Sequence, residues 1–527
     1  MKKSLFGISL LTITSLYFLL AIIIILVTLL TKIPVIYGIA FSILLLIIQF
    51  LISPFITDLT MRWFYGVKFK YELPEYLKQF IEEICKNNNM KMPRIGFIDD
   101  GAPNAFTYGH TKNDARIIIT RGILELLNEE EVKSVVGHEL GHATHYDMLV
   151  MTAAQIVPLV LYGIYEVLNN NDDNNNSKSQ LVAMIAYILY VISNYLVLAL
   201  SRNREYYADS FSIEATKNPN ALASALVKIG YGLTTAETNK KHSAANSNAL
   251  GIFDSKASKA LVVTSLDNGE ISKDNIKQAM KWEKWNPWAT WYEIHSTHPL
   301  ISKRLLAISS RSNEFNQEPY IVFDLKQEES YVDDFLIEVL INFLPSITCI
   351  IGLIIISLSY IFEFNTIFAG GILLLLLDIA SFIKFRRRYS KKPFNSTNVR
   401  NLLSEVKVSG ITSIPCTLEG EIIGRGDPGC IFNEDFVIKD ETGIIFLDYN
   451  QPINLANKLF AIFKSKDFID KKVKITGWYR RSPVPYVEIL KIEVDDKTKK
   501  LYNYGFHWAM HVFLLITAII VMIFSII

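Results

Sequence analysis

Cysteine is scarce in this sequence, and neither sign of charge dominates it. The 527 residues include four cysteines and no Cys-x-x-Cys, so the pattern indicates neither a thiolate zinc site nor a disulfide framework. Such scarcity fits soluble parts that face a reducing, cytoplasmic compartment. The 53 basic residues nearly balance the 52 acidic ones, and a net charge of +1 gives no reason to expect a nucleic-acid partner.

Long apolar runs are what the sequence has in abundance. Half of the residues are hydrophobic, and they gather in runs of the length that a membrane-spanning helix needs. The first run is longer than the apolar core of a signal peptide and has no small-residue cleavage site. The runs cover about residues 5–30, 35–59, 149–168, 181–200, 339–362, 367–383 and 508–526. We therefore expect a mainly α-helical, multipass protein of the lipid bilayer.

Five consecutive parts are expected from these runs and from the segments between them. The region after the fifth and sixth runs has short alternating strands separated by turns, which predicts a small β-barrel, OB-like in type. The parts are two N-terminal transmembrane helices (1–60), a mixed region with a transmembrane hairpin at about 149–200 (61–334), a second transmembrane hairpin (335–385), the β-barrel (398–497) and a C-terminal transmembrane helix (504–527).

Basic residues near the apolar runs predict the orientation. If the runs alternate across the bilayer, almost all nearby lysines and arginines fall on one side, including Arg202, Arg204 and the cluster Arg386–Arg388. The opposite loops carry only Lys32 and Lys178. Basic loops stay cytoplasmic, so we expect a plasma-membrane protein whose N-terminus and soluble domains are cytoplasmic.

Residues 138–142 form a His-Glu-x-x-His motif. On a helix, His138 and His142 lie one turn apart on one face and can chelate one metal ion. Glu139 lies beside them, where a base for a metal-bound water belongs. We expect this helix to begin at Glu129 and to run without a break into the apolar run at 149–168.

Two histidines leave a catalytic zinc ion one protein ligand short. Helix lengths favour Glu205, because about 28 residues (roughly 42 Å) lead from the motif to the next loop and about 24 residues (roughly 36 Å) lead back. Asp209, one turn later, could accept a hydrogen bond from a ligand histidine. His145 could approach the site, but a polar surface position on the helix is the favoured interpretation. The candidates for a further ligand are His145, Asp147, Glu205, Asp209 and His298.

Residues 103–109 lie between two predicted strands, at 94–99 and 115–120. An extended peptide could pair with a strand edge here, which makes Asn104, Ala105 and Phe106 candidate substrate-binding residues. An ordinary turn explains the segment equally well.

A second pair of histidines, His507 and His511, also has helical spacing. No glutamate follows His507, and the pair lies where an apolar run begins beside Trp508. These features favour a belt at the membrane interface over a second metal site.

Four motifs in one order resemble the HtpX-type membrane metalloproteases, which are relatives of the CAAX prenyl endopeptidases. The resemblance covers about residues 1–309. The motifs are Pro103-Asn104-Ala105-Phe106 with Gly109, the His-Glu-x-x-His with Asp147, Arg204-Glu205-Tyr206-Tyr207-Ala208-Asp209, and Ser296-Thr297-His298-Pro299-Leu300 with Arg304.

This resemblance implies a zincin-like (gluzincin) domain with a small β-sheet. It implies one zinc ion per chain, held by His138, His142 and Glu205, with Glu139 as general base and acid. It also implies a role for His298 near the substrate carbonyl, where the imidazole could stabilise the oxyanion. The residues expected to support these groups are Asp209, Asp147 and Arg304.

The function expected from motif and resemblance together is a membrane-embedded, zinc-dependent endopeptidase. It would cleave misfolded or membrane proteins at the cytoplasmic face, with zinc-bound water as nucleophile and Glu139 as its base. Its partners would be a protein or peptide substrate and the bilayer. Two alternatives stay open: a processing peptidase for one specific, for example lipidated, substrate, and a non-catalytic membrane scaffold that contains zinc.

Overall fold

The structure is a computed structural model, and it comprises two compact units. The first contains the described residues of 1–230 and 291–323, and the second those of 266–290 and 324–526. The described residues are 2–526 except 32–34, 65–66, 70, 99–104, 121–122, 125–126, 170–176, 231–265, 268–269, 272, 426–433, 443, 470, 483 and 496.

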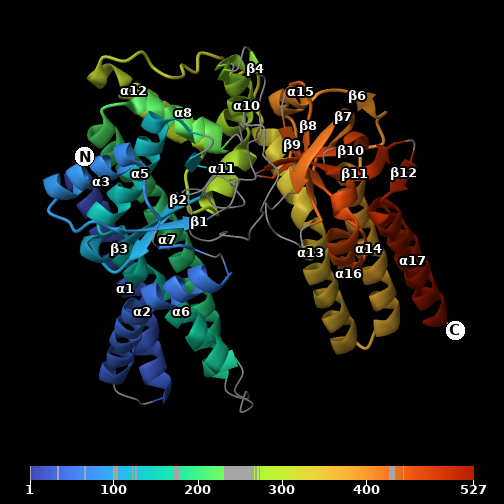
Figure 1. The fold of residues 1–527 in the computed structure, drawn as a ribbon. Coiled ribbons are helices and arrows are strands. Elements are labelled where there is room, and N and C mark those ends of the chain that lie inside the picture. Colours follow the sequence, from blue (N-terminus) through green and yellow to red (C-terminus); the bar gives the residue numbers. More distant parts are fainter. Residues whose placement is uncertain are drawn as a thin grey trace. The chain divides into compact units, whose positions relative to one another are not determined.

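Long apolar helices form one part of the first unit (Figure 1). They are α1 (Lys2–Thr31), α2 (Val35–Phe64), α6 (Asp147–Asn169) and α7 (Ser177–Thr216). Side chains of α1, α6 and α7, among them Leu20, Val157 and Ala186, share one buried apolar cluster. This cluster packs the three helices against one another. It therefore fixes the position of α7 relative to α1 and α6.

A three-stranded sheet lies in the same unit, with the strand order β1-β3-β2. β1 (Arg94–Ile98) pairs in parallel with β3 (Ala115–Thr120), and β3 pairs antiparallel with β2 (Ala105–Gly109). The predicted strands are therefore present. The segment after Asn104 is a strand too, so the alternative of an ordinary turn at 105–109 is wrong: hydrogen bonds to β3 hold it extended.

The helix with the His-Glu-x-x-His motif, α5 (Glu129–Thr144), does not run into the membrane helix as expected from the sequence. It ends at a cap on His145, and Tyr146 takes a left-handed backbone conformation with φ of 57° before α6 begins at Asp147. The left-handed residue turns the chain and ends the helical hydrogen-bond ladder. α5 and α6 are thus separate helices.

Shorter helices complete the first unit. α3 (Glu75–Asn87) buries one apolar face. The others are α8 (Pro219–Gly230), α12 (Ile301–Ser310), and the 3₁₀ turns η1 (Lys112–Asp114) and η2 (Ser312–Phe315). α11 (Pro287–Ile294) crosses the division between the two units.

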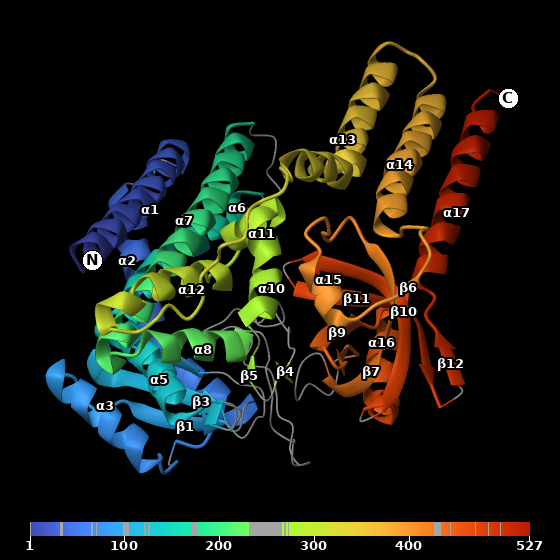
Figure 2. The same cartoon turned by 90° about the horizontal axis from the view of Figure 1, so that it is seen from above.

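The second unit combines three long helices with a β-domain. The helices α13 (Val332–Ile361), α14 (Thr366–Arg388) and α17 (Asn503–Phe524) project from one end of that domain (Figures 1 and 2). The domain's strands are β6 (Asn395–Ser396), β7 (Ile414–Arg425), β8 (Phe436–Lys439), β9 (Ile444–Asp448), β10 (Lys472–Ser482), β11 (Val484–Val494) and β12 (Lys497–Lys500). Its short helices are α15 (Val399–Ser404), α16 (Asn454–Phe463) and the turn η3 (Ser465–Phe468).

Five of these strands close into a barrel. Neighbours pair in the order β7-β8-β9-β11-β10, and a further pairing of β10 with β7 joins the ends. β9 and β11 are parallel, and the other pairs are antiparallel. The predicted small barrel is therefore confirmed. The hairpin β4 (Leu266–Asp267)–β5 (Glu270–Ile271) and α10 (Lys273–Trp285) belong to the same unit.

Among the described residues, six helices are long and apolar enough to cross a membrane. These are α1, α6, α7, α13, α14 and α17. The chain is therefore a multipass membrane protein that is mostly helical, as expected. α2 is not among the six, so a second N-terminal span stays a prediction.

Candidate metal centre

Helix α5 presents the two motif histidines side by side. Asn128 begins the helix with a capping box, in which its side chain accepts from the backbone of Glu131 and Glu131 accepts from the backbone of Asn128. One turn apart, the rings of His138 and His142 lie edge to face, with centroids 4.7 Å apart. Their Nε2 atoms are 3.1 Å from each other, so two ligand atoms point at one place.

Helix α7 brings Glu205 to that place. Its carboxylate oxygens lie 3.5 Å from Nε2 of His138 and 3.5 Å from Nε2 of His142. The two helices can approach because Gly141 has no side chain: a Cβ there would lie 3.1 Å from Cα of Ala208. The geometry therefore agrees with the length argument that selected Glu205.

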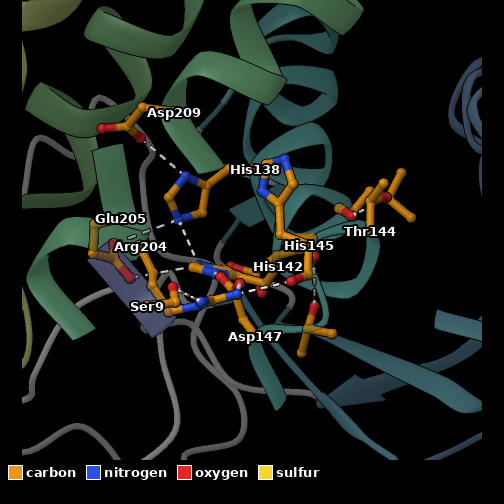
Figure 3. Close-up of polar contacts among 12 residues, drawn as sticks. Ser9, His138, His142, Thr144, His145, Asp147, Arg204, Glu205 and Asp209 are labelled. Carbon is orange, nitrogen blue, oxygen red and sulfur yellow. Dashed lines mark hydrogen bonds and ion pairs between the residues drawn. The ribbon is translucent and has the colours of Figure 1, made fainter. Parts of the chain in front are cut away.

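Each histidine is oriented through its other ring nitrogen. Nδ1 of His138 lies 2.9 Å from a carboxylate oxygen of Asp209, and Nδ1 of His142 lies 2.6 Å from one of Asp147 (Figure 3). Such contacts fix the ring and direct Nε2 toward a metal. Asp209 was predicted for this position, and Asp147, also expected to support the site, turns out to hold the second histidine.

Both orienting carboxylates are themselves bound by arginines. Arg304 of α12 donates to Asp209 through Nε (2.9 Å) and Nη2 (2.6 Å). Arg204 of α7 donates to Asp147 and, through Nη2, to the backbone carbonyl of His145 at 2.8 Å. These charge-assisted bonds hold the buried carboxylates in place.

Arg204 also connects the site to the first membrane helix. Its Nη1 donates to the hydroxyl of Ser9 in α1 at 2.8 Å (Figure 3). Sequence reasoning used Arg204 only as a marker of orientation and as part of a motif, and it did not identify Ser9. A buried aspartate such as Asp147 needs a cationic partner, and this requirement could have pointed to Arg204. Nothing in the sequence pointed to Ser9, which is 195 residues from Arg204.

His298 and Arg304 converge on the third ligand candidate. Nδ1 of His298 lies 3.0 Å from Oε2 of Glu205, and Nη1 of Arg304 lies 3.2 Å from the same oxygen. His298 lies in the loop before α12, where its backbone N–H donates to the hydroxyl of Ser296. The structure thus brings together all the predicted residues of α5, α7 and α12.

Glu139 lies beside the histidines and away from water. It is 1% exposed, and burial raises the pKa of its carboxyl. Its Oε1 has no hydrogen-bond partner among the described residues. Thr107 of strand β2 donates to its backbone carbonyl at 3.2 Å, so an edge strand passes next to the motif.

The donor set fits a divalent metal ion. His138, Glu139 and His142 each offer a ligand atom within 4.8 Å of the others, and the oxygens of Glu205 face both imidazoles. Burial opposes protonation of His138, but Asp209 and Glu205 outweigh it and raise its pKa to about 9. The carboxylates around the two histidines therefore favour a positive charge at this place, which suits a bound cation. Imidazole together with carboxylate is a donor set typical of zinc.

Some predicted residues lie elsewhere. The side chains of Ala105 and Phe106 are buried, and Phe106 packs in a core cluster with Met61 and Ile118. Any contact with a peptide would therefore use the backbone of β2. Asn104 lies outside the described residues. The ring of His145 contacts Phe211 instead of the metal-binding atoms.

Comparisons with known proteins agree with this geometry. A family model described as "Peptidase family M48" matches residues 73–312. Among curated proteins, a "Protease HtpX homolog" of Methanothermobacter thermautotrophicus is 40% identical over 193 residues, which cover 37% of this chain and 72% of that protein. Another, of Picrophilus torridus, is 30% identical over 298 residues, 54% of this chain and 88% of that protein.

A solved structure, the crystal structure of S. mikatae Ste24p, shares 16% identity with this chain. It covers 56% of this chain and 62% of its own, with a TM-score of 0.33. The family match ends before the second unit's long helices and barrel, which begin at Val332.

Proposed function

We propose that this chain, which belongs to peptidase family M48 and is a membrane metalloprotease of the HtpX type, is a zinc-dependent endopeptidase. Its substrates would be misfolded or membrane proteins, cleaved at the cytoplasmic face. The observation that carries the proposal is the convergence of His138, His142 and Glu205 next to the buried Glu139. A base beside three ligands has a use in catalysis and none in a structural metal site.

The roles of the residues follow from their contacts. His138, His142 and Glu205 would hold one zinc ion, which would polarise the substrate carbonyl and lower the pKa of water. Glu139, whose raised pKa makes it a stronger base, would take a proton from the attacking water and pass it to the leaving amine. Asp209 and Asp147 keep the two imidazoles in the orientation that this arrangement requires.

His298 would stabilise the oxyanion. Its Nδ1 lies 3.0 Å from Glu205, and its Nε2 would be the nitrogen that donates to developing negative charge. Arg304 is committed to Asp209 and Glu205, so it would position these carboxylates and not contact the substrate.

The substrate would bind as an additional strand. β2 is at the edge of its sheet, and among the described residues no strand pairs with its outer side. The hydrogen bond from Thr107 to the backbone of Glu139 fixes this edge beside the motif. Main-chain pairing along a strand edge recognises extended peptides with little regard to their side chains, which suits many different substrates.

The cytoplasmic orientation rests on the distribution of basic residues. α14 ends in Arg386, Arg387 and Arg388, directly before the β-domain, which supports a cytoplasmic barrel. The strand order and the helix α16 between β9 and β10 support an OB-like assignment for that domain. We propose the part boundaries at 60, 334, 385, 398–497 and 504 as first expected.

A comparison of wild type with Glu139→Gln tests the proposal. The amide preserves the shape of the side chain but cannot act as a base, so zinc content should stay at one per chain while cleavage falls by about 10²–10⁴-fold. The readouts are metal analysis of the purified chain and proteomics of membranes that contain either form. Equal cleavage by both forms would disprove the role of Glu139.

The same experiment separates the alternatives. Many substrates that accumulate with the variant support quality control, whereas a single one supports a processing peptidase. A wild type that binds zinc but cleaves nothing, in membranes and on a test membrane protein, would favour the scaffold.

A further inference from the structure

Helix α16 of the β-domain has an apolar row that no other part of the described chain covers. Leu455, Leu459 and Phe463 recur every fourth residue and are 65%, 46% and 73% exposed. This spacing puts them on one side of the helix. Three large apolar side chains in a row on a ten-residue helix make a continuous exposed stripe, which in a soluble surface would be costly.

The other side of α16 is fixed to the barrel. Phe460 is buried and stacks on Tyr449, with ring centroids 3.9 Å apart and planes 7° from parallel. Lys499 of β12 lies over the same ring at 3.6 Å. Asn457, also buried, accepts from the backbone N–H of Gln451 at 2.9 Å. These contacts set the rotation of the helix, so the apolar stripe cannot turn inward.

A hydrogen bond relates α16 to the start of a membrane helix. The side-chain carbonyl of Gln451, two residues before Ile453, accepts from the backbone N–H of Tyr502 at 3.2 Å. Tyr502 is the cap of α17, whose candidate span begins at Asn503. The segment that leads into α16 therefore lies next to the first residues of α17.

The junction between this end of the barrel and the spans is rigid. Glu488 of β11 accepts hydrogen bonds from Tyr389, the residue after α14, at 2.6 Å and from Asn503 of α17 at 3.0 Å. Arg480 donates to the same carboxylate. The barrel that carries α16 is therefore joined directly to the ends of two candidate spans.

Charge completes the pattern. Lys458 is exposed one helical turn after Leu455, and Lys464, also exposed, follows the helix directly. A short helix with apolar residues on one side and lysines beside them is typical of segments that lie in the plane of a membrane interface. Lysines near the surface of a cytoplasmic leaflet are also attracted to anionic lipids.

We propose that α16 lies in the headgroup layer of the bilayer that its own unit spans. Leu455, Leu459 and Phe463 would be inserted at the boundary of the acyl chains, and Lys458 would lie among lipid phosphates. The occupant of the stripe is thus lipid. This contact would seat the barrel on the membrane surface and fix its tilt, and it holds whether or not the proposed protease activity does.

Photo-cross-linking in the full-length chain tests this proposal. Benzoylphenylalanine replaces Leu459 or Phe463 in protein reconstituted into vesicles of phosphatidylcholine and phosphatidylglycerol, and mass spectrometry identifies the adducts. Both positions are exposed, so the label should not disturb folding. The expected result is adducts with lipid at both positions.

Two control positions give the expected range of lipid cross-linking yields. Ile516 on α17 is 51% exposed in a candidate span and should give lipid adducts. Asn401 is exposed on α15, whose apolar residues Val399, Leu402 and Leu403 are buried, and should give severalfold fewer. Yields at 459 and 463 that match Asn401, while Ile516 reacts with lipid, would overturn the proposal. Adducts at 459 and 463 with protein in place of lipid would overturn it as well.

Discussion

Asp209 and Asp147 perform the same task for the two histidines from different helices. Each carboxylate touches Nδ1 of one ring, and each is held by one arginine. The arrangement links each motif imidazole to a buried carboxylate whose charge an arginine balances. Because the arginines are themselves buried, loss of either carboxylate would also leave a cation without its partner.

We therefore expect Asp209→Asn to weaken metal binding by about 10–100-fold, with Asp147→Asn in the same range. An amide cannot match the charge of the carboxylate, so the imidazole is a poorer donor and its ring is less firmly oriented. Competition with a chelator measures the change. Glu130→Gln serves as the control, since Glu130 is on the same helix as the motif but is exposed, and its side chain pairs with Lys133. Unchanged affinity in Asp209→Asn would contradict the orienting role.

At the scale of elements, the approach of α5 to α7 depends on glycine at one position. A Cβ on Gly141 would lie 3.1 Å from both Cα of Ala208 and Cβ of Phe211, whereas one on Gly137 would be 3.4 Å from the hydroxyl of Ser212. A side chain at position 141 would be too close to the backbone of α7, so α5 and α7 would have to move apart. A side chain at position 137 would make an ordinary van der Waals contact.

The two glycines accordingly predict opposite results. Gly141→Ala should cost about 1–3 kcal/mol of stability through overpacking and weaken metal binding, because Glu205 moves away from the histidines. Gly137→Ala should be neutral or stabilising, since alanine favours a helix over glycine by about 1 kcal/mol. Thermal unfolding and metal titration of both variants check this. If Gly137→Ala is the more harmful change, the helix contact is not the cause.

The pairing of α14 with α17 contains a polar link. Nδ1 of His511 lies 2.7 Å from a carboxylate oxygen of Asp378, in helices that are both candidate spans. The sequence assigned His511 to an interfacial belt and missed its partner, which is 133 residues away. Polar groups in a membrane helix are satisfied within the protein, so this contact selects the face that α17 turns to α14.

Replacement of His511 by leucine should lower stability by about 1–2 kcal/mol, because Asp378 loses its partner in an apolar surrounding. Asp378→Leu together with His511→Leu should recover part of this loss, since no polar group is then left unpaired. A double-mutant cycle on the thermal unfolding of the reconstituted protein measures the coupling. Zero coupling energy would mean that the contact contributes nothing to helix pairing.

Across the whole molecule, what the sequence predicted depended on how local its signals were. The spacing of His138 and His142 is a property of one helix turn, and Glu205 followed from helix lengths. The barrel followed from alternating strands. The break at Tyr146 had no such signal, because a single non-glycine residue in the left-handed region leaves no composition cue.

Tertiary contacts account for the other misses. Strand β2 is short and starts beside a proline and an asparagine, so its strand character comes from pairing with β3 and not from its own pattern. Ser9 and Asp378 found their partners only through the packing of helices. Residues such as these are visible once the elements are placed, and a single sequence does not place them.

The continuity of α7 gives bilayer thickness a direct influence on the metal centre. α7 is unbroken from Ser177 to Thr216, while the turn at Tyr146 separates α5 from its membrane helix. A long helix adapts to hydrophobic mismatch by tilting. Tilt of α7 would shift Glu205, whereas the turn would spare the two histidines the same movement. Metal affinity measured in vesicles of increasing acyl-chain length should therefore pass through a maximum. The acyl-chain length of the membrane lipids would then determine how closely Glu205 approaches the two histidines.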